Sequence, residues 1–167
     1  QLHLEQRIPF ATFERLLSKR QFADHLFPSP VAAVIQPDLS LVGGIRSAVE
    51  IGAMCEAAQV ALAPHCPYGP IQFAASLQVA AASPSHTFQE FQSLGGAAGG
   101  GIPGGGAKWS FNLLETPFMV DDGMVEIPKG PGLGIEVQEH LIEEHLDAWN
   151  PHPPAIWQHP DGAHAEW

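Results

Sequence analysis

Basic residues are scarce in this sequence of 167 residues, which has 7 Lys and Arg against 18 Asp and Glu and a formal net charge of −11. Nucleic acids and anionic membrane surfaces bind to basic patches, so we expect neither of them as a partner. An anionic substrate would need a local cation, such as a bound metal ion, to hold it against this charge.

Cysteines are few and long apolar runs are missing. Cys55 and Cys66 fit neither a metal-site nor a redox spacing, so we expect two reduced thiols in a cytoplasmic protein. No apolar run approaches the roughly 18 residues that a membrane-spanning helix needs. No signal peptide is recognisable either.

What is present is an alternation of short β-prone runs with segments of helical periodicity. Predicted strands lie at residues 8–13, 31–35, 60–63 and 86–91. Predicted helices lie at residues 16–27, 45–59 and 71–82. Strands that alternate with helices in this way predict a parallel sheet built from compact βα units.

Each predicted strand ends near a residue that can do chemistry: Glu14, Asp38, His65 and Glu90. A single histidine after an apolar run is more often structural than catalytic. However, the carboxyl ends of parallel strands face one common mouth in a barrel, so these four side chains are expected to converge there.

The four residue types suit removal of a proton α to a carboxylate. Glu14 offers a hard oxygen ligand of the kind Mg²⁺ takes, although it could instead cap the next helix. Asp38 would orient His65, which would act as general base, although Asp38 could simply cap a turn. Glu90 would hydrogen-bond a substrate oxygen. A metal ion would stabilise the resulting ene-diolate.

The remainder of the chain carries weaker signals. Residues 93–108 are a Gly-rich loop, and their formal G-x-G-x-x-G is rejected as a dinucleotide site because Pro103 interrupts it and no clear helix follows. Residues 109–167 form a C-terminal segment and tail, with a short strand at 124–127, a turn at 130–134 and a short helix at 137–146. The histidines after residue 137 lack metal-ligand spacing and are expected to be solvated or packed: His140, His145, His152, His159 and His164.

Several motifs make the chain resemble the C-terminal half of the mandelate racemase/muconate-lactonizing branch of the enolase superfamily, most closely its D-galactonate dehydratases. They are IPFATFER at 8–15, IQPDLS at 35–40 with GGI at 43–45, ALAPHCP at 61–67 with GPI at 69–71, QE at 89–90, GPGLG at 130–134, and DG at 161–162 with AEW at 165–167.

This resemblance implies a role for each of the four residues. Glu14 matches the third metal ligand, on strand five of the barrel. Asp38 and His65 match the dyad of strands six and seven, with His65 taking the α-proton. Glu90 matches the strand-eight carboxylate that hydrogen-bonds the substrate. The implied reaction is Mg²⁺-dependent loss of water from a sugar acid, with a 2-keto-3-deoxy product.

The implied fold class is α/β: the C-terminal half of a (β/α) TIM-type barrel, strands five to eight, plus a tail that would pack on a capping domain. Residues 1–92 would form four βα units of that barrel. Two metal ligands, the general acid and the capping domain have no counterpart in the sequence, and Phe13 stands where the family usually has Gly. We therefore expect a fragment that is inactive alone, from a parent expected to form a homo-oligomer.

Two alternatives stay open. The same site residues would serve a racemase or another sugar-acid dehydratase of this branch, because substrate choice resides in the capping domain and loops. The chain could also be a truncated, non-catalytic remnant.

Overall fold

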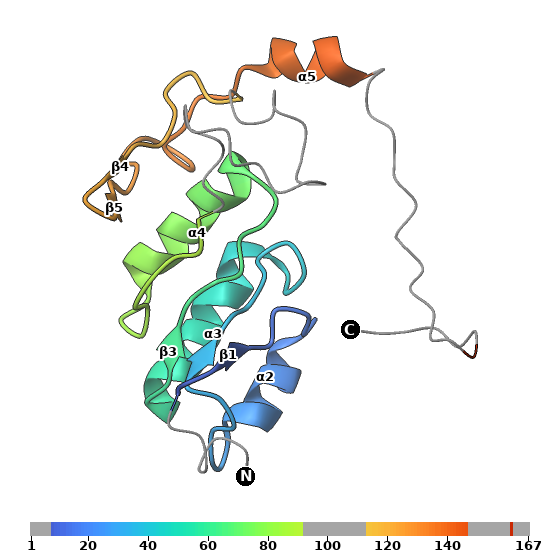
Figure 1. Ribbon diagram of the computed structural model, residues 1–167, viewed down its shortest axis with the longest axis vertical. Helices are drawn as coiled ribbons and strands as arrows, with labels where there is room; N and C mark the ends of the chain where they lie inside the picture. Colours follow the sequence, from blue (N-terminus) through green and yellow to red (C-terminus); the bar gives the residue numbers. More distant parts are fainter. Residues whose placement is uncertain (1–7, 92–112, 147–160, 162–167) are drawn as a thin grey trace. The chain divides into compact units, whose positions relative to one another are not determined.

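The computed structural model describes residues 8–91, 113–146 and 161 (Figure 1). The chain divides into two compact units, Gln1–Val137 and Gln138–Trp167, which are described separately. The first unit contains three parallel βα units and a β-hairpin; the second contains one described helix, α5 (Glu139–His145). The Gly-rich stretch 93–108, nearly all of the tail and His152, His159 and His164 lie outside the described residues.

The sheet consists of β1 (Ala11–Thr12), β2 (Val34–Ile35) and β3 (Ala61–Leu62), all parallel and in the order β1-β2-β3. The strands are shorter than the predicted runs, but their positions and direction confirm the prediction. Pairing between the second and third strands resumes beyond their ends, because an isolated parallel bridge joins Asp38 to His65. This bridge fixes the register of the two polar residues that follow the strands.

The three helices follow from their local sequence signals. In α2 (Lys19–Leu26), the Ser18 hydroxyl accepts from the Gln21 N–H while the Gln21 side chain accepts from the Ser18 N–H, a capping box that starts the helix later than predicted. The other two are α3 (Gly44–Ala58) and α4 (Pro70–Ala82). Proline suits the first position of a helix because its missing N–H would have no partner there.

The predicted fourth strand is wrong. Only one parallel bridge forms, between Leu62 and His86. Around it, Leu62 N–H donates to Ser85 O at 2.8 Å and Thr87 N–H donates to Leu62 O at 3.1 Å. The next bond of a parallel ladder would need an N–H from Pro64, which proline lacks, so the pairing stops after one step.

The main core lies between the sheet and the helices. In Figure 1, α3 lies between α2 and α4, and α3 packs against both. Each fully buried aliphatic or aromatic side chain contributes about 2 kcal/mol. The core residues come from all three βα units: Phe22, Leu26, Ala32, Ile35, Leu39, Val42, Ala48, Ile51, Cys55, Val60, Leu62 and Val79.

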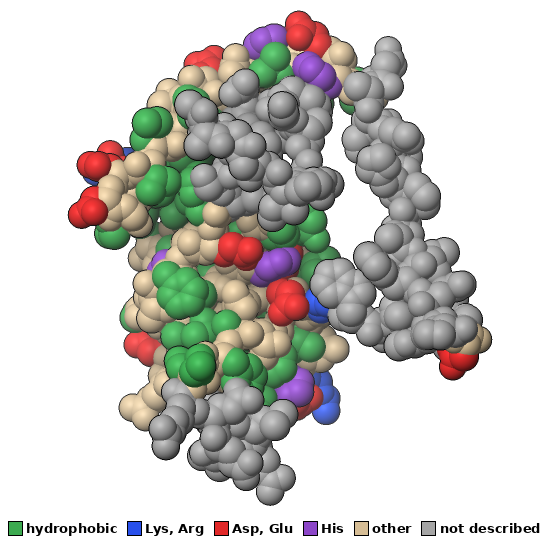
Figure 2. Space-filling view, viewed as in Figure 1, with side chains coloured by type: hydrophobic (Ala, Val, Ile, Leu, Met, Phe, Trp, Pro, Cys, Tyr) green, Lys and Arg blue, Asp and Glu red, His purple; other side chains and the backbone are tan. Residues whose placement is uncertain are grey.

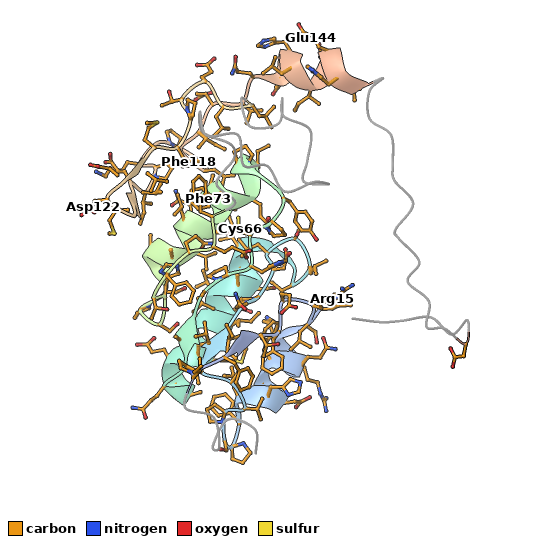
Figure 3. All side chains as sticks on the ribbon, in the orientation of Figure 1. Arg15, Cys66, Phe73, Phe118, Asp122 and Glu144 are labelled. Atoms are coloured by element: carbon orange, nitrogen blue, oxygen red, sulfur yellow. The ribbon has the colours of Figure 1, made fainter. Side chains whose placement is uncertain are left out.

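A second cluster joins the segment 113–137 to α4. The ring of Phe73 packs edge-to-face against Phe118, with centroids 4.9 Å apart (Figure 3). This segment contains a hairpin of β4 (Val120–Asp121) and β5 (Met124–Val125), antiparallel to each other. The sequence predicted a strand only at 124–127. The turn has positive φ at Asp122 and Gly123, as a two-residue Asp-Gly hairpin turn requires.

In the second unit, α5 begins two residues later than predicted and has no buried residue. Within the described ranges, the structure contains no helix long and apolar enough to cross a membrane.

Candidate functional site

The ends of β2 and β3 bring Asp38 and His65 together. His65 Nδ1 lies 2.9 Å from Asp38 Oδ2. The Asp38 side chain is completely buried, whereas 26% of the His65 side chain is exposed. On the face shown in Figure 2, acidic and histidine side chains gather in the middle of the first unit. The pair predicted from the sequence therefore forms, with only the imidazole reaching solvent.

This geometry sets the tautomer of the imidazole. An ionised carboxylate can only accept hydrogen bonds, so the proton of a neutral His65 ring resides on Nδ1. The other ring nitrogen, Nε2, then carries a lone pair that can accept a proton. A carboxylate behind a histidine also stabilises the imidazolium that forms when the ring is protonated. The arrangement suits a general base.

The second oxygen of Asp38 is held by other donors. Oδ1 accepts from the Ser40 N–H at 2.8 Å, from the Ser40 hydroxyl, and from Gln72 Nε2 at 2.9 Å. Gln72 was not predicted as a site residue. The only signal was its type, because it is the one polar side chain in the first turn of a largely apolar helix.

Glu90 is also brought to this region, although its predicted strand does not form. Its Oε2 accepts from the Cys66 backbone N–H at 2.8 Å, one residue after His65. The neighbouring Gln89 donates to Pro64 O at 2.9 Å. Side-chain bonds to the backbone thus hold residues 89–90 against the loop that follows β3, in place of a strand ladder.

Glu14 lies two residues beyond β1 and is half-buried. The preceding Phe13 has φ of +81°, a conformation that glycine adopts without strain and a phenylalanine does not. Its ring stacks on the His25 imidazole with centroids 4.5 Å apart. Among the described residues, no three His, Cys, Asp or Glu side chains form a group that could hold a metal ion. The structure brings Asp38, His65 and Glu90 to the loops after β2 and β3, and no hydrogen bond or ion pair among the described residues joins Glu14 to them.

Both cysteines are free, buried thiols. Burial raises the pKa of the Cys66 thiol to about 12, and the nearby negative charge of Glu90 acts in the same direction. Burial likewise raises the pKa of Cys55 to about 12. A nucleophilic cysteine needs a lowered pKa, so neither thiol suits that role.

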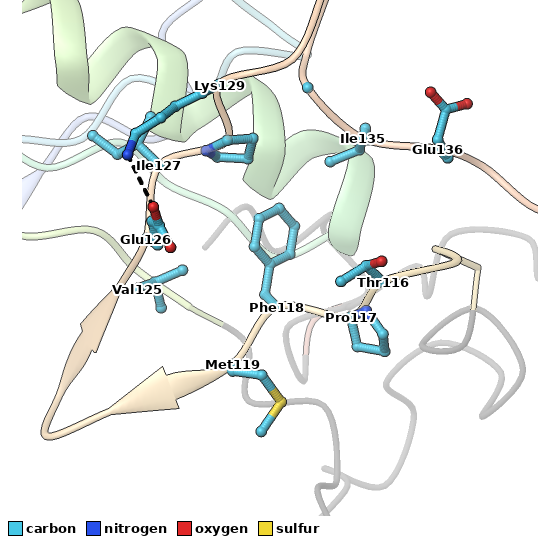
Figure 4. A pocket seen from close by; sticks show the side chains of 12 residues that line it. Thr116, Pro117, Phe118, Met119, Val125, Glu126, Ile127, Lys129, Ile135 and Glu136 are labelled. Carbon is cyan, nitrogen blue, oxygen red and sulfur yellow. Dashed lines mark hydrogen bonds and ion pairs between the residues drawn. The ribbon is translucent and has the colours of Figure 1, made fainter.

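A pocket of about 450 Å³ lies elsewhere, formed within residues 116–136 (Figure 4). Its lining is largely apolar, with Phe118 among the side chains and an ion pair between Lys129 and Glu126 at 3.0 Å. None of the four predicted site residues lines it.

Comparison with known proteins gives matches along most of the chain. Residues 1–141 match the family described as Enolase C-terminal domain-like. A D-galactonate dehydratase from Ralstonia pickettii is 40% identical over 164 residues, covering 96% of this chain and 40% of the relative. A D-galactonate dehydratase from Verminephrobacter eiseniae is 38% identical, covering 99% of this chain and 42% of the relative.

A solved structure has the same fold. An enolase from Agrobacterium radiobacter, crystallised with sodium and L-malate, superposes with a TM-score of 0.80 at 28% identity, covering 98% of this chain and 41% of that one. The chain thus spans about 40% of the length of the relatives it matches. These matches confirm the resemblance and the fold class: the chain belongs to the Enolase C-terminal domain-like family and corresponds to the C-terminal half of its (β/α) barrel.

Proposed function

We propose that this chain carries the general base of a sugar-acid dehydratase, with His65 removing the proton α to the carboxylate of D-galactonate or a similar aldonic acid. The observation that carries the proposal is the 2.9 Å pairing of partly exposed His65 with fully buried Asp38. The substrate class comes from the names of the relatives, which are D-galactonate dehydratases.

In this proposal, Nε2 of His65 takes the α-proton, and the electron pair of the broken C–H bond moves towards the substrate carboxylate. The buried Asp38 carboxylate stabilises the imidazolium that results. The β-hydroxyl takes a proton from a general acid, which we propose lies outside the described residues, and leaves as water; the resulting enol tautomerises to a 2-keto-3-deoxy acid. Glu90, held 2.8 Å from the Cys66 N–H, is the candidate to hydrogen-bond the substrate beside the base.

The described residues do not by themselves fit a magnesium site, because no three ligand side chains gather among them. Glu14 supplies one carboxylate at the end of β1. A divalent cation needs several oxygen ligands. We therefore propose that further ligands lie outside the described residues, and we derive no step through the metal.

The lack of three metal-ligand side chains among the described residues favours a second candidate, a non-catalytic chain that keeps the fold but has no enzymatic activity. Turnover distinguishes the two candidates. A racemase using the same base would instead interconvert the two configurations at the α-carbon and release no keto acid.

The test compares His65→Asn with His140→Asn, a matched substitution on exposed α5. Each is made in the full-length product of the gene, with the 167-residue chain assayed in parallel. Formation of 2-keto-3-deoxy acid from D-galactonate is measured, together with exchange of the α-proton in D₂O. A lost general base lowers the rate by about 10²- to 10⁴-fold, whereas His140→Asn leaves it unchanged. Full activity of His65→Asn, or no turnover of any aldonic acid by the unsubstituted protein, would overturn the proposal.

A further inference from the structure

We infer that Gln72 is a positioning residue, which fixes the Asp38 carboxylate and through it aims the His65 imidazole. This inference rests on the proposed function of His65 as the base. It stands on a set of contacts made by one side chain to two separate loops.

The Gln72 amide binds at both of its ends. Nε2 donates to Asp38 Oδ1 at 2.9 Å and to the His65 carbonyl at 3.3 Å. Oε1 accepts from the Tyr68 N–H at 3.0 Å. One side chain thus joins the loop after β2 to two points of the loop after β3. These two loops carry Asp38 and His65, respectively.

The origin of each donor separates Gln72 from Ser40. Ser40 lies two residues from Asp38 in the same loop, so its two bonds move with the carboxylate. Gln72 lies on α4, so among the described donors to Oδ1 it alone ties the carboxylate to another element. With Oδ1 occupied in this way, Oδ2 is left for His65.

The start of α4 holds Gln72 in place. The N-cap residue Gly69 has φ of +118°, and Pro70 fixes the first helical position. A buried carboxylate without donors is costly, so these contacts also stabilise the charge on Asp38. A positioning residue does more than stabilise this charge: through Asp38, Gln72 controls the tautomer and the direction of the His65 ring.

The chain offers a matched control on the same helix. The Gln78 amide donates to Pro128 O at 3.0 Å and to Leu133 O at 3.3 Å, and so ties α4 to the segment 113–137 rather than to the dyad. Replacing Gln78 removes the same kind of amide bonds from α4. If Gln72 only stabilised the fold, Gln78→Met should therefore have the same effect on the His65 tautomer as Gln72→Met.

The test measures the tautomer of neutral His65 by ¹⁵N NMR in the 167-residue chain, at a pH chosen from the measured titration of the His65 signal. That signal is assigned from His65→Asn. The variants are Gln72→Met, which removes both ends of the amide, and Gln72→Glu, which keeps the acceptor for Tyr68 but removes the donor to Asp38. In the unsubstituted chain, the Nδ1-protonated form should predominate. Both Gln72 variants should shift the ring towards a mixture of tautomers, and Gln78→Met should not.

In the active full-length protein, Gln72→Met should lower kcat about tenfold with little change in KM. The reason is that the bond from Gln72 to Asp38 is lost, and one net hydrogen bond is worth about this factor. Unchanged tautomer and kcat in both Gln72 variants, with His65→Asn inactive, would overturn the positioning role while leaving the proposed function standing. If His65→Asn stays active, the proposed function fails instead. If Gln72→Met does not fold, Gln72→Glu decides by the same tautomer measurement.

Discussion

The ends of β2 and β3 differ sharply from the end of β1. After β2 and β3, Asp38 and His65 are joined by a direct bond, and the buried carboxylate accepts further donors from Ser40 and Gln72. After β1, half-buried Glu14 follows a residue with positive φ, and no hydrogen bond or ion pair among the described residues holds its carboxylate.

This difference separates two kinds of site residue. The dyad is organised by this chain's own hydrogen bonds, so its geometry can be tested without a ligand. The carboxylate after β1 has no such support among the described residues. The predictions below test this contrast through stability.

The largest effect is expected from Asp38→Ala compared with Glu14→Ala. Removing the buried Asp38 carboxylate leaves the donors of Ser40, Gln72 and His65 without their acceptor, which should lower the free energy of unfolding by about 3 kcal/mol. Glu14→Ala should change it by less than about 0.5 kcal/mol, as at other sites without such contacts. Urea unfolding of the 167-residue chain measures both values. Equal losses would contradict the contrast.

A smaller effect is expected at Phe13, from the comparison of Ala with Gly. Both substitutions remove the ring that stacks on His25, but only glycine relieves the cost of φ at +81°. Phe13→Gly should therefore be more stable than Phe13→Ala by about 1 kcal/mol. The difference in thermal or urea midpoint between the two variants measures this, and a more stable alanine variant would show that the backbone there is not strained.

The smallest effect concerns His86, a residue outside the dyad that should make the stability of the fold sensitive to acid. Burial lowers the pKa of the imidazole below 6.5, against a smaller opposite effect of Gln89. The unfolded chain therefore binds a proton at this residue before the folded chain does, so stability falls as the pH drops through 6.5. His86→Gln should lose less stability between pH 7 and pH 5 than the unsubstituted chain. Parallel unfolding curves at several pH values measure this, and equal pH dependence would exclude His86 as a cause.

Much of the first unit could be predicted from the sequence. The apolar runs located three strands, the helical periodicity located α2, α3 and α4 within a few residues, and the polar residues after the strands pointed to the dyad. Asp38 and His65 could be paired in advance because parallel strands place their carboxyl ends at one edge of a sheet. The domain boundaries and the roles of the four site residues stay predictions.

Other features depended on partners distant in the sequence. The run at 86–91 has the composition of a strand, but the proline in its neighbour cannot donate to it. Gln72 shows no motif, and its role emerges only where α4 meets the loops that carry Asp38 and His65. The β4 strand was missed because its two residues, Val120 and Asp121, are too few to show an alternation of apolar and polar side chains.

The sequence by itself determined the parallel βα order, the places where the strands end, and the residue types at those ends, because these follow from local periodicity and turn chemistry. The tertiary structure alone decided the contacts around the Asp38–His65 pair. It held Glu90 through the Cys66 backbone N–H rather than through a strand, and it brought Gln72 of α4 to Asp38. The physical reason is that a hydrogen bond needs its two atoms about 3 Å apart, and for residues in different elements the packing of those elements sets that distance.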